Sequence, residues 1–312
     1  MRAESGSSTE TTLDVGVAAH NEAPRIARAI RSLLAQELPK GFRWGSFRVV
    51  ASGCTDGTAE AARAVDPRVQ VFEESERRGK SAALAQLMEK CDAPFLVLLN
   101  ADAVARPGAV AELLRAVRHD AAPFAASARP ILRSGEPPGV FGRSVRLLWR
   151  IHHQFQRWAA VHGRLTTISD ELLLLSGKEL PPIREGIVND GGFIATWLTG
   201  LGRQPRYVPD AIVEIEPAPD LATYVRQRRR ILAGLDQTRS ITGVRSATAE
   251  SVVLTHPAEV VHMVSRAMRE EPGGQPYALL ALAVAESAAW ILARWDRLRR
   301  RAAPAVWVRR PS

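Results

Sequence analysis

The side chain best suited to chemistry in this sequence is a carboxylate that follows an apolar run. Residues Phe95–Leu99 are all apolar, and Asn100-Ala101-Asp102 follows directly. Such a run is typical of a strand buried on both faces, as in parallel sheets. Ligands of open α/β sheets bind at the carboxyl ends of the strands, so Asp102 is placed to hold a divalent cation, which would in turn hold a diphosphate. A turn-forming role for Asp102 is an equally good interpretation of this segment taken alone.

The elements that must position this carboxylate alternate between strands and helices. We expect strands over residues 13–19, 47–51, 69–72 and 95–100, followed by helical patterns at 24–34, 58–65, 79–90 and 110–117. Pro107 suits the first turn of the last helix, where its missing donor costs nothing. Four strand–helix units in succession predict a parallel sheet with right-handed crossovers.

Composition favours a large α/β domain and gives little support to nucleic-acid binding. The chain has 312 residues, is 46% hydrophobic and carries a net charge of +9, enough for one large domain and an appendage. Only four of its 42 basic residues are lysines, and no nucleic-acid motif accompanies the charge. Seven arginines lie between Arg294 and Arg310, against Asp296 alone. The positive charge is therefore concentrated near the C-terminus, and we expect no nucleic-acid partner.

The cysteines and the N-terminus indicate a cytoplasmic protein. Cys54 and Cys91 have neither the spacing of a zinc site nor a disulfide framework, which predicts a reducing compartment. Residues 1–12 are polar and lack the apolar core of a signal peptide. We expect residues 1–12 to be disordered and the protein to lie in the cytoplasm or at the cytoplasmic face of a membrane.

Several short motifs together resemble the family 2 glycosyltransferases, which are inverting enzymes of the GT-A fold. The motifs are Ala18–Glu22, Ser52–Thr58, Gly79-Lys80, Asn100–Asp102, Asn189-Asp190, Tyr207–Ala211 and Gln227–Ile231. Each is weak alone. The resemblance is specific from Leu13 to Gly234, because the motifs occur in the family's order and the early ones lie at predicted strand ends.

The resemblance implies a metal site at Asp102. In the family a DxD motif holds Mg²⁺ or Mn²⁺, which neutralises the donor diphosphate as it becomes the leaving group. Asp102 matches the metal-binding carboxylate, and Asn100 stands in place of the first Asp. An amide keeps an acceptor oxygen but loses the charge. The resemblance thus implies a metal affinity below that of the full motif.

The resemblance assigns the general base to Asp190. This residue matches the Asp of the family's ED motif, which takes the proton from the acceptor hydroxyl, and Asn189 replaces the Glu. An inverting displacement needs one base opposite the leaving group. The alternative is that Asn189 and Asp190 cap a helix over residues 191–198, since both residue types are N-cap formers. The two roles are compatible.

Gln227 and Arg230 match the QxxRW motif, in which the Arg would face the diphosphate. They lie one helical turn apart and so share a face. Ile231 replaces the Trp, and an Ile side chain cannot stack on a sugar acceptor, which argues against a polysaccharide synthase. The alternative is a solvated basic face formed by the arginines of residues 226–230.

The resemblance implies further donor contacts. These residues are Ala18, Glu22, Ser52, Lys80, Asn100 and Ala101. Lys80 would meet the nucleotide or its phosphates, although an ordinary helix start explains it nearly as well. Ala51-Ser52 stands where many members carry Asp-Asp, one of which contacts the base, and this difference leaves the nucleotide open. We interpret Asp56 as a turn former and Thr58 as a helix cap.

Two amphipathic helices lie outside these motifs. Residues 144–161 carry an apolar stripe that predicts a helix covering the sheet, with a membrane or lipid acceptor as the less frequent explanation. Residues 277–295 are long enough to cross a membrane, but Glu286 sits near the centre, and the basic tail would lie on the wrong side. We favour a helix that packs on the domain or lies in the membrane interface.

The sequence therefore predicts an α/β protein with a GT-A, Rossmann-like, mostly parallel sheet flanked by helices over residues 13–243. A helical C-terminal region with a basic tail would cover 244–312. The expected activity is metal-dependent, inverting transfer of a sugar from a nucleotide diphosphate to a sugar, lipid-linked or small-molecule acceptor. One alternative is a nucleotide-sugar-binding protein without catalysis. A nucleotidyltransferase ranks last, because the segment Ala18–Glu22 contains no glycine to form a phosphate loop.

Overall fold

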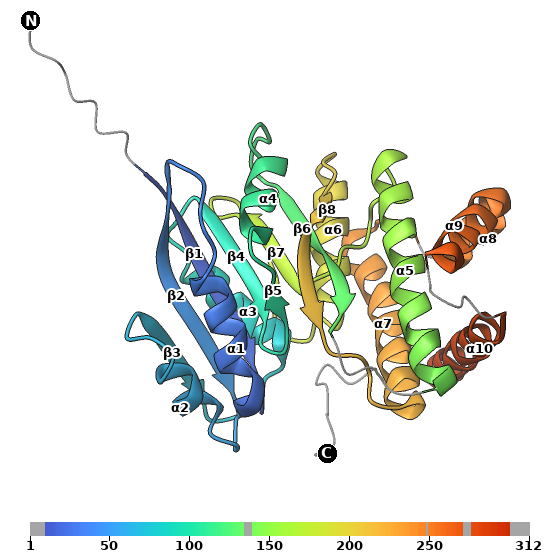
Figure 1. Ribbon diagram of the computed structural model, residues 1–312, viewed down its shortest axis with the longest axis horizontal. Helices are drawn as coiled ribbons and strands as arrows, with labels where there is room; N and C mark the ends of the chain where they lie inside the picture. Colours follow the sequence, from blue (N-terminus) through green and yellow to red (C-terminus); the bar gives the residue numbers. More distant parts are fainter. Residues whose placement is uncertain (1–9, 134–138, 248, 271–275, 300–312) are drawn as a thin grey trace, which may run out of the picture.

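The computed structural model describes residues 10–133, 139–247, 249–270 and 276–299, and it has one mixed sheet (Figure 1). The strands are β1 (Thr11–Ala19), β2 (Phe42–Ser52), β3 (Val69–Glu74), β4 (Phe95–Asn100), β5 (Val104–Ala105), β6 (Ala125–Leu132), β7 (Leu172–Ser176) and β8 (Arg206–Ile215). Their order is β3-β2-β1-β4-β7-β6-β8-β5. Four of these seven pairings are parallel, which confirms the predicted α/β fold with a mostly parallel sheet.

The four predicted strand–helix units are confirmed. Helices α1 (Ala23–Leu34), α2 (Thr58–Arg63) and α3 (Lys80–Glu89) follow β1, β2 and β3, and α4 (Ala109–Ala116) follows β4 after the two-residue β5. Ala18 of β1 pairs with Val50 on one side and Asn100 on the other. The carboxyl ends of β1, β2 and β4 therefore meet at one edge of the sheet. Strand β1 begins at Thr11, inside the predicted disordered segment, and residues 1–9 lie outside the described residues.

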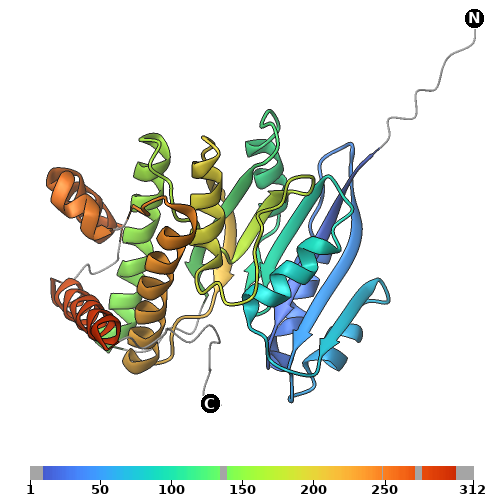
Figure 2. The same ribbon diagram turned by 180° about the vertical axis from the view of Figure 1, so that it is seen from behind.

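The apolar run before Asp102 is buried on both faces, as its composition predicts. Val97 and Leu99 belong to the core under α1, α2 and α4, whereas Leu96 and Leu98 belong to the core under α3 and α6 (Asp190–Gly200). Figure 2 shows α3 and α6 on the face opposite α1. The sheet is thus the middle layer of three.

The second half of the sheet was not predicted, and it contains a reversal that shapes the site. Strand β7 runs antiparallel to β4, with Leu172 opposite Leu99. The amide of Asn100 donates to the carbonyl of Glu171 at 3.0 Å. Because of this orientation, the residues that precede β7 lie beside those that follow β4.

A helical layer extends the molecule beyond β6 and β8 (Figure 1). It consists of α5 (Gly139–Val161), α7 (Leu221–Thr242), α8 (Ala249–Thr255), α9 (Pro257–Arg269) and α10 (Pro276–Leu298). Leu147 and Trp158 of α5 are buried, so the predicted stripe of this helix packs in the interior. Leu147, Tyr224 and Leu282 join α5, α7 and α10 in one apolar cluster.

Candidate active site

A lysine and two aspartates form the centre of the site. Lys80 is the first residue of α3, Asp170 precedes β7, and Asp190 is the first residue of α6. The Nζ of Lys80 lies 2.8 Å from Oδ2 of Asp190 and also forms an ion pair with Asp170. Asp190 is only 5% exposed. The cluster thus holds one buried carboxylate of the predicted active site in a defined position.

Capping and close packing explain why the Asp190 carboxylate is available to pair with Lys80. Asn189 is the N-cap of α6, and its Oδ1 accepts from the amide of Gly192 at 2.8 Å. The predicted cap is therefore confirmed for Asn189, which leaves the carboxylate of Asp190 to pair with Lys80. A Cβ at Gly191 would lie 2.4 Å from the carbonyl oxygen of Ile168. Only glycine lets α6 approach the segment that carries Asp170.

Burial and the neighbouring charges separate the pKa values of the two aspartates. Burial and the charge of Asp170 raise the pKa of Asp190 to about 6, although Lys80 opposes the shift. Burial alone would raise the pKa of Asp170, but the charge of Lys80 together with hydrogen bonds from Asp190, from Lys80 and from the backbone lowers it to about 2. Both carboxylates raise the pKa of Lys80 against its own burial. A carboxylate with a pKa near 6 is a better proton acceptor than an ordinary aspartate.

Two further carboxylates lie toward the end of β4. Asp102 follows β4 in a turn, and its charge helps to raise the pKa of Glu171 to about 8, after burial and Asp170. The Oε2 atom of Glu171 is buried and makes no hydrogen bond within the described part of the chain. An unsatisfied carboxylate oxygen near a second carboxylate fits a hard divalent cation such as Mg²⁺ or Mn²⁺.

The part of the chain that the structure describes does not provide a complete metal site by itself. Among the described residues, no group of three or more His, Cys, Asp or Glu side chains is arranged to hold a metal ion. Asp102, with Glu171 nearby, would therefore hold the cation together with oxygens from a ligand. Phosphate oxygens usually complete the coordination of such cations in nucleotide sites.

Two arginines form a basic side of the site. Arg230 of α7 donates from Nη2 to the carbonyl of Val188 at 3.1 Å, and its Nε is buried without a hydrogen-bond partner in the described residues. Arg77 is half-buried, and its backbone lies against Gly53 at the end of β2. Burial and the charge of Arg230 lower the pKa of Arg77. Two neighbouring guanidinium groups near the carboxyl ends of parallel strands fit an anion such as a diphosphate.

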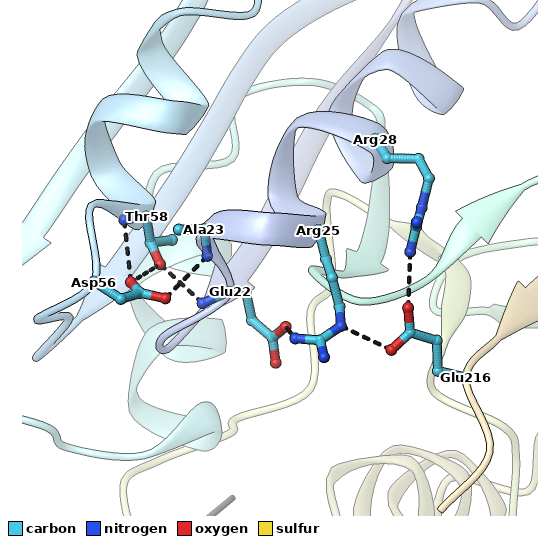
Figure 3. A network of polar contacts seen from close by, with 7 residues as sticks. All are labelled: Glu22, Ala23, Arg25, Arg28, Asp56, Thr58 and Glu216. Atoms are coloured by element: carbon cyan, nitrogen blue, oxygen red, sulfur yellow. Dashed lines mark hydrogen bonds and ion pairs between the residues drawn. The ribbon is translucent and has the colours of Figure 1, made fainter. Parts of the chain in front are cut away.

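A polar network joins the loops that follow β1 and β2 (Figure 3). Asp56 accepts hydrogen bonds from the amide of Ala23 at 3.1 Å and from the amide of Thr58 at 3.2 Å. The hydroxyl of Thr58 accepts from the amide of Glu22 at 2.8 Å and donates to Asp56. The structural role predicted for Asp56 is thus confirmed. The predicted cap at Thr58 is wrong, because Gly57 occupies the N-cap and Thr58 ties two loops together.

The same network extends to the end of β8. Arg25 binds Glu22 at 2.9 Å and Glu216 at 2.7 Å, and Arg28 also binds Glu216 (Figure 3). Glu22, a predicted donor contact, is therefore engaged in holding α1 to β8. Ser52 is buried, and its hydroxyl accepts from the amide of Arg78 at 3.3 Å, so it supports the segment that carries Arg77.

The structure places most of the predicted site residues around the carboxyl ends of β1, β2 and β4. Ala18 and Asn100 are paired at the ends of β1 and β4, and Ala101 is buried in the turn before Asp102. Gln227 lies half-buried one turn before Arg230 on α7. Lys80 is in the site, where it pairs with Asp170 and Asp190.

Three residues of the site were missed by the sequence analysis. They are Arg77, Asp170 and Glu171. The pair Asp170-Glu171 directly precedes a run of four leucines, and that run could have been recognised as a buried strand. Its antiparallel direction, which brings the pair to Asp102, is not visible in the sequence.

The comparisons with known proteins agree with this fold. The model of glycosyl transferase family 2 matches residues 14–167. A comparison with curated proteins finds no match. The mannosyltransferase PcManGT from Pyrobaculum calidifontis, in complex with GDP-Man and Mn²⁺, is similar in structure, with a TM-score of 0.64 and 20% identity. The similarity covers 92% of this chain and 88% of that one.

A second similar structure is glucosyl-3-phosphoglycerate synthase from Mycobacterium tuberculosis, in complex with Mn²⁺, UDP and phosphoglyceric acid. Its TM-score is 0.53 at 19% identity, over 76% of this chain and 80% of that one. At identities of 20% and 19%, these two similarities show the fold alone. The family match comes from the sequence of the first half of the chain. Residues 14–167 therefore form a glycosyl transferase family 2 domain, and the chain has the GT-A fold of a glycosyltransferase.

Proposed function

We propose that this enzyme transfers a sugar, with inversion, from a nucleotide diphosphate donor to an acceptor hydroxyl, and that Asp190 is the general base. The observation that carries the proposal is the buried Asp190 carboxylate, which Lys80 holds at 2.8 Å, while Arg230 binds the carbonyl of Val188 two residues away. Asp190 accepts the proton of the acceptor hydroxyl as its oxygen attacks the anomeric carbon. The bond from that carbon to the diphosphate breaks on the opposite face.

The other residues of the proposed site stabilise the leaving group. Arg230 and Arg77 would bind the diphosphate, whose negative charge grows as the bond breaks. Asp102 would hold Mg²⁺ or Mn²⁺, which supplies charge neutralisation on the diphosphate when bound. Lys80 and Asp170 orient Asp190, because Lys80 forms an ion pair with each of the two carboxylates.

The proposal extends to the compartment, the acceptor class and the domain boundaries. The structures of similar proteins contain GDP-Man or UDP with Mn²⁺, which supports a nucleotide-sugar donor. The acceptor is a sugar, a lipid-linked sugar or a small molecule. Cys54 and Cys91 are free thiols, which supports a cytoplasmic location. The catalytic domain would comprise residues 13–243, and the helical region residues 244–312.

Titration with a panel of nucleoside diphosphates and Mn²⁺ tests the donor site. We expect metal-dependent binding of at least one nucleotide, and we expect Asp102→Ala to lose the metal-dependent part. Asp92→Ala is the matched control, because the Asp92 side chain is 91% exposed at the other end of β4. Unchanged nucleotide binding by Asp102→Ala would return this residue to a turn-forming role.

Turnover of the bound nucleotide sugar tests the base. Asp190→Asn is nearly isosteric, so the fold should persist while transfer or donor hydrolysis falls by about 10²–10⁴-fold. Equal turnover by the variant would contradict the assignment of Asp190. Donor binding without any turnover by the parent protein would instead indicate a nucleotide-sugar-binding protein that lacks catalysis.

A further inference from the structure

Helix α10 presents an apolar row to solvent. Leu280, Val284, Ile291 and Leu298 are 67%, 62%, 60% and 73% exposed, and they follow one another at helical spacing on a single face. Trp295 lies on the same face and is 51% exposed. The apolar stripe of this segment, which the sequence analysis assigned either to packing or to a membrane interface, therefore points away from the protein.

The opposite face of α10 is attached to α7. Glu286 binds Arg228 at 2.8 Å and also accepts a hydrogen bond from Tyr224. Asp296 accepts from Nε of Arg229 at 3.1 Å. Small side chains complete this face, since Ala278, Ala285 and Ala289 are buried. These contacts fix the helix against the domain with the apolar row outward.

The helix is apolar enough to cross a membrane but is not arranged to do so. Its mean hydropathy is 1.6 over the most apolar window, of which 22% is buried. A transmembrane orientation would break the ion pairs of Glu286 and Asp296 and place the Glu286 carboxylate in hydrocarbon, which is strongly unfavourable. A helix that lies along a surface keeps both ion pairs and still covers its apolar row.

Positive charge surrounds the end of this row. The Arg294 guanidinium lies 5.5 Å from the centre of the Trp290 ring, and that of Arg299 lies 4.5 Å from the Trp295 ring. The sequence continues with Arg300, Arg301, Arg309 and Arg310. Tryptophan prefers the boundary between lipid and water, and arginine pairs with lipid phosphates.

We propose that the outer face of α10 docks in the plane of an anionic lipid bilayer. Leu280, Val284, Ile291, Trp295 and Leu298 enter the boundary between headgroups and acyl chains, and Arg294 and Arg299 bind lipid phosphates. Since Arg228 and Arg229, which hold α10, belong to the same helix as Arg230, the docked helix is joined directly to the proposed active site. The docking proposal does not depend on the reaction assigned to that site.

Vesicle binding by the full-length protein tests the proposal. We expect binding to phosphatidylcholine vesicles that contain phosphatidylglycerol, weakening as ionic strength rises, and much weaker binding to phosphatidylcholine alone. Ile291→Glu should reduce binding by about tenfold or more, because it places a charge in the centre of the row. Leu201→Glu is the control, since Leu201 is 53% exposed at the end of α6. Circular dichroism and Tm should show that both variants fold.

Several results would overturn the docking surface. The first is absence of binding to anionic vesicles at low ionic strength. The second is an equal loss of binding in Ile291→Glu and Leu201→Glu. Sedimentation tests whether a second copy of the chain covers the row instead. If the parent protein forms dimers and does not bind vesicles, and Ile291→Glu dissociates those dimers, the row is a dimer interface.

Discussion

The pH dependence of turnover should respond in opposite directions to two substitutions beside Asp190. Asp190 accepts a proton only when ionised, so activity should be lost as the pH falls through its pKa of about 6. Asp170→Asn removes the like charge that helps to raise this pKa and leaves Lys80 in place. Lys80→Met removes the cation that opposes the shift.

The geometry sets the size of the effect. Asp170 and Asp190 bind the same Nζ atom, so their charges are separated by about 5 Å, which corresponds to about 3 kcal/mol at an effective dielectric constant of about 20. This energy equals about two pKa units. The acid limb of the profile should therefore move about two units lower in Asp170→Asn, and it should move above pH 6 in Lys80→Met.

The assay is release of nucleoside diphosphate from the bound nucleotide sugar, measured as kcat/KM across the pH range. Lys90→Met, near the other end of α3, is the control for loss of a positive charge and should leave the profile unchanged. Circular dichroism checks that each variant is folded. Shifts in the same direction for Asp170→Asn and Lys80→Met, or no shift in either, would refute the reasoning.

Three other predictions concern the anion site, the packing of α6 and the interior of α5. Arg77→Ala should weaken nucleoside diphosphate binding by about 10- to 100-fold, measured by calorimetry, without affecting binding of the nucleoside alone. Arg78 is exposed and paired with Glu185 at 2.9 Å, so the control variant Arg78→Ala should bind as the parent protein does. Gly191→Ala places a Cβ 2.4 Å from a carbonyl oxygen and should lower the free energy of unfolding by about 1–3 kcal/mol; an unchanged Tm would contradict the close approach. Burial first, and nearby positive charges second, lower the pKa of His153 to about 3, so stability should decline as the pH falls from about 6.5 toward 3, where only the unfolded chain binds the proton. Urea titrations should show a smaller decline for His153→Phe.

Local patterns in the sequence determined the first half of the fold. The apolar run of Phe95–Leu99 predicted a strand buried on both faces, and it is buried because its alternate side chains enter different cores. Asp102 was correctly placed just after this strand, and Asn189 was correctly identified as a helix cap. These features depend on hydrophobic periodicity and on capping, which act over a few residues and are therefore visible in the sequence.

The tertiary structure decided which of these residues meet. The antiparallel direction of β7 brings Asp170 and Glu171 to the end of β4, and the position of α3 turns Lys80 toward Asp190. The same is true of α10, whose apolar stripe was evident but whose outward direction follows from the ion pair between Glu286 and Arg228. Strand direction and ion pairs between distant elements depend on packing across the whole chain, because residues far apart in sequence must form them and no local pattern specifies which partners are chosen.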